Sequence, residues 1–235
     1  MTGILTSGHV TRVLAALETV RDPELDTSIV ELQFVSSCTV SDDGVAQVRL
    51  RLPTYFCAPN FAFLMVADAY DAVTAVDGVS RAEIVLEDHF ASDTINEGVA
   101  AHAGFVAAFD GEARSELHEL RAKFIRKAML AGQDRVARPL ITAGTALAEL
   151  ADMRLGDVPP SADLDRLRER RAELDIRSDD DAALLVDGTG AAVGLEALPL
   201  HLRRARTTRV NIEANASHCL SLLATRYGVG SVTEQ

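Results

Sequence analysis

The feature that most constrains the fold is a pair of alternating segments within residues 33–52, joined by the turn sequence Ser-Asp-Asp-Gly. In the second segment Ala46, Val48 and Leu50 alternate with polar residues. Successive side chains of a strand point to opposite faces, so this pattern buries one face and leaves the other in water. Residues 33–40 alternate in the same way. The two segments therefore predict a β-hairpin.

Helical patterns flank this hairpin. Residues 9–20 carry apolar side chains three and four positions apart, and Pro23 is expected to stop that helix. A second apolar stripe runs over residues 62–76, with Asn60 as the predicted N-cap. Residues 76–88 predict a third strand. The order αββαβ predicts an α+β fold, a two-layer sandwich in which both helices cover the core face of a small sheet.

The remainder of the chain is mostly helical in pattern. Further helices are predicted at residues 112–130, 140–153 and 211–227. The clearest linker is Gly156 to Asp163, where two prolines precede Ser161 as the N-cap of a charged helix. We expect three parts: an N-terminal domain at 1–90, a helical extension at 91–155, and a C-terminal helical region with a short hairpin at 156–235.

Charge and composition exclude several classes of partner. Asp and Glu outnumber Lys and Arg by 35 to 23, and the resulting net charge of -12 disfavours nucleic acid and anionic membranes as partners. The N-terminus lacks a basic region followed by an apolar core, and no segment is long and apolar enough to span a membrane. We therefore expect a cytoplasmic protein. Its three cysteines contain no C-x-x-C pair and are expected to be thiols.

Cys57 is the strongest candidate for chemistry, because it lies in a loop just before a predicted helix. The free N–H groups and partial positive charge of a helix N-terminus stabilise a thiolate, which can bind a soft metal. The alternative is that it packs as a small hydrophobic residue. Cys38 shares a strand face with apolar residues and is assigned to the core. Cys219 follows His218, and adjacent helical residues point about 100° apart, so packing is expected there too.

Acidic residues and a histidine offer further candidates. Asp22 and Glu24 flank Pro23, so their carboxylates are held at the end of a helix, as acid-base groups, metal ligands or simple turn residues. His89 closes the third predicted strand and is either a metal ligand or a solvated strand end. Walker A, G-x-G-x-x-G, G-x-S-x-G, H-E-x-x-H and Glu-x-x-His sequences are all absent. The sequence therefore lacks the standard catalytic motifs.

A resemblance to a known family rests on an ordered set of residues: Asp22, Pro23, Glu24, Ser28 to Leu32, Val35, Thr54, Cys57, Gly78 and Val79. In order and spacing this set resembles the iron-sulfur cluster assembly domain family, with its SufT-like and PaaD-like members. The resemblance covers about residues 10–89. Where the family has a glycine, this chain has Gln33, and Ala58 separates the cysteine and proline that are adjacent in the family.

The resemblance implies a maturation factor that assists insertion of an iron-sulfur cluster or iron into client metalloenzymes, such as a multicomponent oxygenase. It implies Cys57 as the ligand or transfer thiol, with Asp22 and Glu24 shaping the site or offering oxygen ligands; His89 is a further candidate metal ligand. One thiolate cannot supply the four protein ligands of a cluster. A second copy in a homodimer, the client or the assembly machinery is therefore expected to complete a transient site.

Two other hypotheses stay open. In the first, the chain is a protein interaction scaffold that keeps the fold without metal chemistry, as the altered positions Gln33 and Ala58 suggest. In the second, it is an enzyme for a small substrate, with Cys57 as nucleophile and His89 as base.

Overall fold

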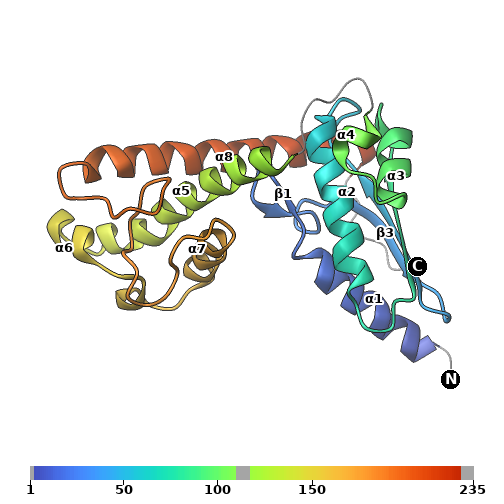
Figure 1. Cartoon of the computed structure of the whole chain (residues 1–235), viewed down its shortest axis with the longest axis horizontal. Coiled ribbons are helices and arrows are strands. Elements are labelled where there is room, and N and C mark those ends of the chain that lie inside the picture. The colour runs from blue at the N-terminus through green and yellow to red at the C-terminus, as the bar shows by residue number, and fades with distance from the viewer. Residues whose placement is uncertain (1–2, 110–116, 229–235) are drawn as a thin grey trace. The chain divides into compact units, whose positions relative to one another are not determined.

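The computed structural model describes the backbone of residues 3–109 and 117–228, and the chain divides into two compact units (Figure 1). Unit 1 comprises Met1–His118 and Asn215–Gln235, and unit 2 comprises Glu119–Ala214. The units differ from the predicted division at residues 90 and 155. The reason is that the segment after the third strand packs on unit 1, and the end of the last helix also belongs to it.

The sheet of unit 1 has the strand order β3 (Val35–Val40), β4 (Val45–Arg51), β5 (Arg81–Glu87). β3 and β4 form the predicted antiparallel hairpin, and β5 pairs with β4 in parallel. The hairpin turn requires a glycine at Gly44, where φ is +83° and a Cβ would lie 2.6 Å from the carbonyl oxygen of Gly78. The hairpin prediction is therefore confirmed.

Two helices, α1 (Gly3–Leu17) and α2 (Pro59–Thr74), contact each other and the sheet (Figure 1). Their apolar residues and those of the sheet form one core, in which the side chains of Leu17, Phe34 and Leu50 are fully buried or nearly so. The other face of the sheet carries polar pairs that include Arg49 and Glu87. The predicted αββαβ sandwich is thus confirmed, although α1 begins and ends earlier than residues 9–20.

Shorter elements complete unit 1. The strands β1 (Arg21–Asp22) and β2 (Thr27–Ser28) form a small antiparallel ribbon between α1 and β3. The helices α3 (Ser92–Ala100) and α4 (Phe105–Ala108) follow β5, and Ile95 of α3 is fully buried in the core. The alanines and glycines of this segment carry little periodicity, so its sequence does not predict these two helices.

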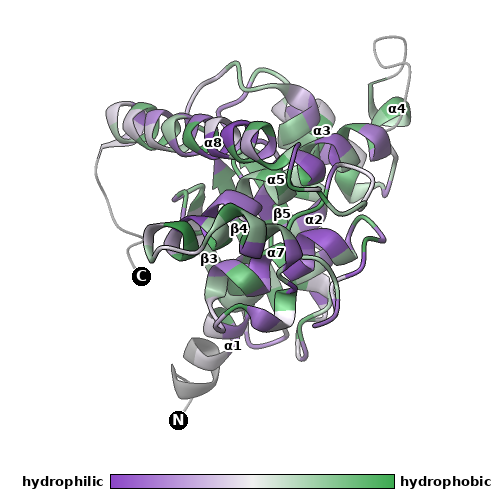
Figure 2. Cartoon of the chain, turned by 90° about the vertical axis from the view of Figure 1, so that its left-hand side faces the viewer, coloured by the Kyte–Doolittle hydropathy of each residue, from purple (hydrophilic) through white to green (hydrophobic). Residues whose placement is uncertain are grey.

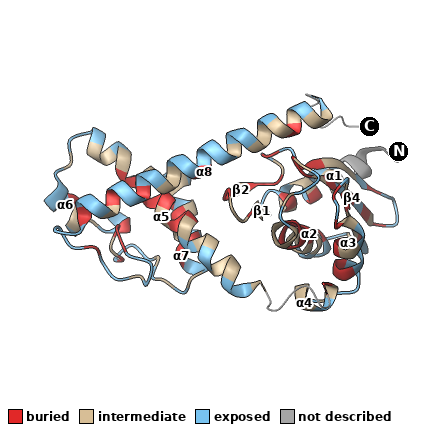
Figure 3. Ribbon diagram, turned by 90° about the horizontal axis from the view of Figure 1, so that it is seen from above, coloured by how far each residue is buried: buried red, intermediate tan, exposed pale blue. Residues whose placement is uncertain are grey.

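Unit 2 is built from α5 (His118–Thr142), α6 (Leu147–Asp152), the short 3-10 helix η1 (Leu155–Asp157), α7 (Ala162–Ala172) and the first part of α8 (Leu198–Tyr227). It has its own hydrophobic core, and Figure 3 shows buried residues along α5 and α7. Gly144, with φ at +100°, lies between α5 and α6. The sequence predicted one continuous helix at residues 140–153, and the chain is interrupted there.

Ser161 caps α7 as predicted, since its side chain accepts a 3.2 Å hydrogen bond from the backbone N–H of Leu164. The proline-rich segment at residues 156–163 lies inside unit 2, so it does not link two domains. In place of the predicted short hairpin there are two isolated bridges, Arg154 with Ala183 and Val186 with Ala192.

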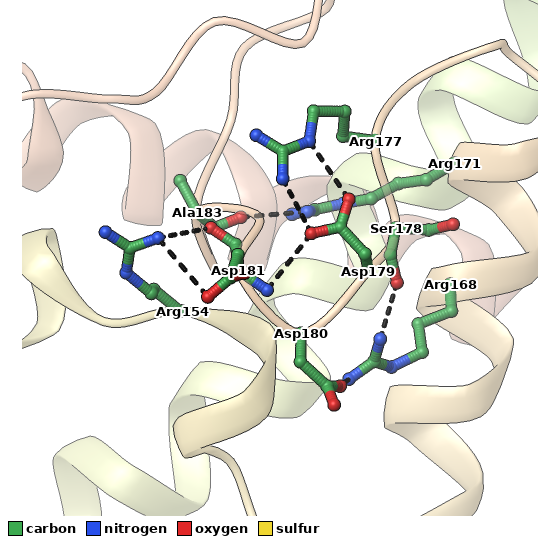
Figure 4. Close-up of polar contacts among 9 residues, drawn as sticks. All are labelled: Arg154, Arg168, Arg171, Arg177, Ser178, Asp179, Asp180, Asp181 and Ala183. Atoms are coloured by element: carbon green, nitrogen blue, oxygen red, sulfur yellow. Dashed lines mark hydrogen bonds and ion pairs between the residues drawn. The ribbon is translucent and has the colours of Figure 1, made fainter.

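Arginines hold the irregular loop at residues 177–184 (Figure 4). The guanidinium of Arg171, fully buried, donates to the carbonyl oxygens of Ala183 at 2.8 Å and Leu184 at 2.6 Å, and burial lowers its pKa to about 10. Arg154 donates to the carbonyl oxygen of Asp181 at 2.8 Å. These contacts satisfy loop carbonyls that lack strand partners, so we assign them a structural role.

Within the part of the chain that the structure describes, no helix is both long enough and apolar enough to cross a membrane. The longest helix, α8, carries polar residues along its whole length (Figure 2).

Candidate functional site

Cys57 lies at the entrance to α2, in the loop that follows β4. The N-cap of α2 is Ala58, and Pro59 is the first helical residue, a position that suits proline because its missing N–H needs no partner there. The predicted cap Asn60 was wrong: it lies inside the helix, and its side chain accepts from the N–H of Phe61 at 3.0 Å. Cys57 is therefore closer to the helix N-terminus than the sequence indicated.

The thiol of Cys57 is half-buried and has a hydroxyl partner. The Oγ1 atom of Thr54 lies 3.4 Å from the Cys57 Sγ atom, and the same oxygen accepts from the N–H of Phe56 at 3.3 Å. An oxygen that accepts from the backbone has its own proton available to donate to a thiolate. The hydroxyl of Thr54 can therefore donate a hydrogen bond to the sulfur.

His89 is buried and fixes the backbone of the cysteine loop. Its Nε2–H donates to the carbonyl oxygen of Cys57 at 2.8 Å, and its Nδ1 accepts from the N–H of Ala91 at 3.2 Å. Burial lowers the pKa of His89, the hydrogen bond to Cys57 opposes this, and the charge of Arg226 lowers it further. Both ring nitrogens have backbone partners, so these contacts do not support the predictions that His89 binds metal or acts as a base.

The Asp-Pro-Glu sequence forms the turn between β1 and β2. Asp22 is only 8% exposed, and its Oδ1 atom accepts from the N–H groups of Glu24 at 2.8 Å and Leu25 at 2.9 Å. The backbone carbonyl of Asp22 also accepts from the N–H of Asp26 at 2.9 Å. Asp22 therefore stabilises the turn, and Glu24 lies half-buried within that turn.

Cys219 packs against the core of unit 1, as the sequence predicts. This residue lies on the last part of α8 and is half-buried. Burial, followed by the charges of Asp22, Cys57 and Glu24 in that order, raises the pKa of Cys219 to about 11. His218 is exposed, so the two adjacent residues do not share a site.

Two thiols and two carboxylates of unit 1 come from three segments distant in sequence: the turn at residues 22–24, the loop at 52–58 and the end of α8. Among residues 3–109 and 117–228, no three His, Cys, Asp or Glu side chains are already positioned to hold a metal ion. These side chains are therefore candidate ligands, not an assembled coordination shell.

An exposed aromatic cluster borders Cys57, and sequence reasoning missed it. Tyr55, Phe56 and Phe90 are 44%, 78% and 49% exposed. The ring centroid of Phe56 lies 5.0 Å from that of Tyr55 and 6.0 Å from that of Phe90. The Tyr-Phe pair directly before the cysteine was a visible signal, whereas the contribution of Phe90 depends on the path of the chain.

Cys38 behaves as predicted for a core residue. It lies on β3, packs against the core of unit 1, and burial raises the pKa of its thiol to about 11. An un-ionised thiol on a strand is a poor metal ligand. Cys38 therefore serves as an internal control for the reactivity of the other two cysteines.

Comparison with known proteins supports the family that the motifs suggested. The model of a family described as iron-sulfur cluster assembly protein matches residues 11–84, which include the Asp-Pro-Glu turn and Cys57. A solved structure, a domain of unknown function (DUF59) from Bacillus anthracis, is similar with a TM-score of 0.34 and 21% sequence identity, covering 43% of this chain and 96% of that one. An uncharacterized protein of Methanocaldococcus jannaschii is 34% identical over 85 residues, which are 36% of this chain and 87% of that protein. From the family match and this archaeal relative, we conclude that the chain belongs to the iron-sulfur cluster assembly protein family.

Proposed function

We propose that this protein is a maturation factor that delivers an iron-sulfur cluster, or iron, to client metalloenzymes, and that it is not itself an enzyme. The observation that carries the proposal is the position of Cys57, one residue before the N-cap of α2 and beside the hydroxyl of Thr54. Membership of an assembly family supports a role with this cargo.

The surroundings of Cys57 suit a thiolate that receives and releases iron. Cys57 precedes the N-cap of α2, at the positive end of the helix dipole, and the hydroxyl of Thr54 lies 3.4 Å from its sulfur. Thiolates are the preferred ligands of iron-sulfur clusters, but each cluster needs about four of them. A cluster on Cys57 would therefore be shared with other ligands, and this incomplete hold favours transfer.

The proposed partners are a client metalloenzyme and other components of the assembly machinery. The exposed cluster of Tyr55, Phe56 and Phe90 supports contact with a protein surface next to the transfer thiol, because exposed contiguous aromatic residues are typical of protein interfaces. The resemblance supports two further proposals, that the client is a multicomponent oxygenase and that a second copy of the chain donates ligands. The free thiols support a cytoplasmic location.

The two alternative functions have less support. The enzyme hypothesis needs His89 as a base, but both of its ring nitrogens are hydrogen-bonded to the backbone. The scaffold hypothesis drew on the extra residue Ala58, yet this residue serves as the N-cap of α2 and leaves Cys57 at the helix start. The scaffold hypothesis does not account for the placement of the thiol at the start of α2.

Anaerobic reconstitution of the full chain with iron(II) and sulfide tests the proposed function. We expect the wild type and Cys57→Ser to differ: the visible charge-transfer absorption of a bound cluster should appear in the wild type and be lost in the variant. Cys38→Ser, which removes a half-buried thiol on β3, is the matched control and should behave as the wild type. Equal cluster content in Cys57→Ser and the wild type would refute the proposal.

A further inference from the structure

The end of α8 is hydrogen-bonded to the two segments on either side of the cysteine loop. The guanidinium of Arg226 donates to the carbonyl oxygen of Leu52 at 3.2 Å, directly after β4, and to that of Asp88 at 2.8 Å, directly after β5. It also pairs with the Asp88 carboxylate at 2.5 Å, and the hydroxyl of Tyr227 donates to the same carboxylate at 3.1 Å. One arginine therefore joins two segments distant in the sequence, because a guanidinium carries donors on more than one edge.

Asp88 has an unusual backbone conformation that these contacts support. Its φ is +51°, in the left-handed region, which is unfavourable for residues with a Cβ although aspartate tolerates it better than most. The next residue, His89, is buried. The direction in which the chain enters His89 therefore depends on the backbone conformation that Arg226 holds at Asp88.

Residues 89 and 90 connect Asp88 to the cysteine loop through two hydrogen bonds. The Nε2–H of His89 donates to the carbonyl oxygen of Cys57 at 2.8 Å, and the backbone N–H of Phe90 donates to the carbonyl oxygen of Tyr55 at 3.2 Å. Both donors follow Asp88 directly in the chain, so a shift of Asp88 moves them together. The printed contacts thus form a continuous path from the end of α8 to the backbone of Cys57.

The helix end that carries Arg226 is itself held in place. Leu223, one turn before Tyr227, is only 2% exposed and packs in the core of unit 1. The guanidinium carbon of Arg51, the last residue of β4, lies 4.9 Å from the centroid of the Tyr227 ring, at a distance where cation and ring attract each other. Arg226 therefore projects from a packed helix, not from a free chain end.

We propose that Arg226 is a positioning residue for the thiol of Cys57: by holding Leu52 and Asp88, it fixes the loop that presents the sulfur at the start of α2. The inference rests on the proposed function and deepens it, because it names what controls the geometry of the transfer thiol. Arg226 lies outside the segment matched by the family model, so the C-terminal part of this chain contributes to the site. Loss of the contact should free the loop and make the half-buried sulfur more accessible.

The first test measures the accessibility of Cys57 in the full chain, without metal. With iodoacetamide at neutral pH, read by mass spectrometry, Cys57 should be alkylated several-fold faster in Arg226→Ala than in the wild type, while Cys38 on β3 keeps its rate. Arg226→Met keeps an apolar stem without donors and should behave as Arg226→Ala. Arg226→Lys keeps one charged donor group but not the guanidinium fork, so its rate should lie between those of the wild type and Arg226→Ala. Arg206→Ala, at an exposed position of α8, should match the wild type.

The second test follows the hydrogen bond between His89 and Cys57 directly. The buried imidazole Nε2–H should give a slowly exchanging downfield proton resonance in the NMR spectrum of the wild type, assigned by its loss in His89→Gln. In Arg226→Ala this resonance should broaden or disappear, while the amide resonances of the β3–β4 hairpin stay in place. A role of Arg226 in helix attachment alone would not change the imidazole resonance.

The outcomes decide between positioning and simple stabilisation. An unchanged Cys57 rate or an unchanged imidazole resonance in Arg226→Ala would overturn the proposal. An equal increase for Cys57 and Cys38 would also overturn it, because it indicates opening of the whole unit. If Arg226→Ala fails to fold, Asp88→Asn decides by the same two measurements, since it removes the carboxylate while asparagine still tolerates a positive φ.

Reconstitution with iron(II) and sulfide separates this inference from the proposed function. Arg226→Ala should hold less than half of the cluster that the wild type binds. If Cys57→Ser loses the cluster but Arg226→Ala retains it in full, the proposed function stands and the positioning role is wrong. If Cys57→Ser retains the cluster, the proposed function is wrong, and the alkylation rate and the imidazole resonance still decide whether Arg226 positions the loop.

Discussion

The imidazole Nε2–H of His89 donates a 2.8 Å hydrogen bond to the backbone carbonyl of Cys57. The second ring nitrogen accepts from the N–H of Ala91, so the ring is neutral and its tautomer is fixed. A buried histidine at the end of β5 thereby sets the path of the loop that carries the proposed transfer thiol. The loop geometry thus depends on the protonation state of His89.

The first prediction follows from the lowered pKa of His89. In the unfolded chain His89 titrates near 6.5, and its folded pKa is lower, mainly because of burial. The unfolded state therefore binds more protons in the window between the two values. The contribution of His89 to the free energy of unfolding should be constant above about pH 7. It should fall as the pH drops below about 6.5 and level off beneath the folded pKa of His89.

Urea unfolding at about pH 7.5 and about pH 5.5 measures this effect, with His89→Gln as the comparison. The variant has no titrating ring, so its loss of stability on acidification should be smaller than that of the wild type. His201 in unit 2 also has a lowered pKa through burial and contributes with the same sign. The difference between the losses of stability in the two proteins therefore isolates the contribution of His89. Equal losses in the wild type and His89→Gln would contradict the prediction.

The second prediction concerns the Asp-Pro-Glu turn. Asp22→Ala removes the acceptor for two backbone N–H groups and should lower the free energy of unfolding by about 2 kcal/mol. Asp22→Asn keeps an acceptor oxygen at the same position and should cost less than half as much. Denaturant unfolding of the three proteins provides the measurement. If the alanine variant were as stable as the asparagine variant, the carboxylate would not be holding the turn.

The sequence alone was enough to predict the sandwich of unit 1, because its signals are local. Alternation in β4, helical spacing in α2 and the glycine turn at Gly44 each depend on neighbouring residues. The position of the α2 N-cap was less predictable. Ala58, the actual N-cap, has no polar side chain that would indicate a cap, whereas Asn60 is a residue type that favours caps but lies inside the helix. Local chemistry therefore gave the elements but not their ends.

The candidate site was predictable only in part, because it combines local and distant contacts. Asp22 and Cys57 each carry a motif signal that depends on residues next to them in the sequence. Cys219 gives no such signal: its spacing with Leu220 and Leu223 predicts an apolar helix face, but not the surface on which that face packs. For the same reason the contact of His89 with the cysteine loop, made by residues 32 positions apart, was not visible.

The third prediction uses Gln33, which stands where the family pattern has glycine. Its φ is +58°, in the left-handed region that disfavours residues with a Cβ, and its side chain is exposed. Gln33→Gly should therefore raise the free energy of unfolding by about 0.5–1 kcal/mol, after the entropy cost of glycine is subtracted. Gln47→Gly, at an exposed position in β4, should lower it by a similar amount. Destabilisation by Gln33→Gly would contradict this account of the backbone.

The fourth prediction concerns the attachment of α8 to unit 1. Arg226→Ala removes the hydrogen bonds to Leu52 and Asp88, so amide hydrogens of residues 219–227 should exchange faster, and Cys219 should react faster with a thiol reagent. Arg206→Ala, an exposed arginine on the same helix, is the matched control and should change neither rate. Hydrogen exchange and alkylation, both read by mass spectrometry, give the result. Unchanged exchange in Arg226→Ala would show that the apolar stripe alone holds the helix end.

The last prediction separates partner contact from metal uptake. Phe56 is 78% exposed, so Phe56→Ser should leave stability and cluster reconstitution unchanged while it removes apolar surface beside Cys57. If the aromatic cluster contacts the client, proteins that co-purify with the tagged wild type from its native host should be depleted several-fold with Phe56→Ser. Leu200→Ser removes another exposed apolar side chain, on α8, and should retain them. Equal depletion by both variants would indicate nonspecific adhesion, and retention by Phe56→Ser would place the client contact elsewhere on the chain.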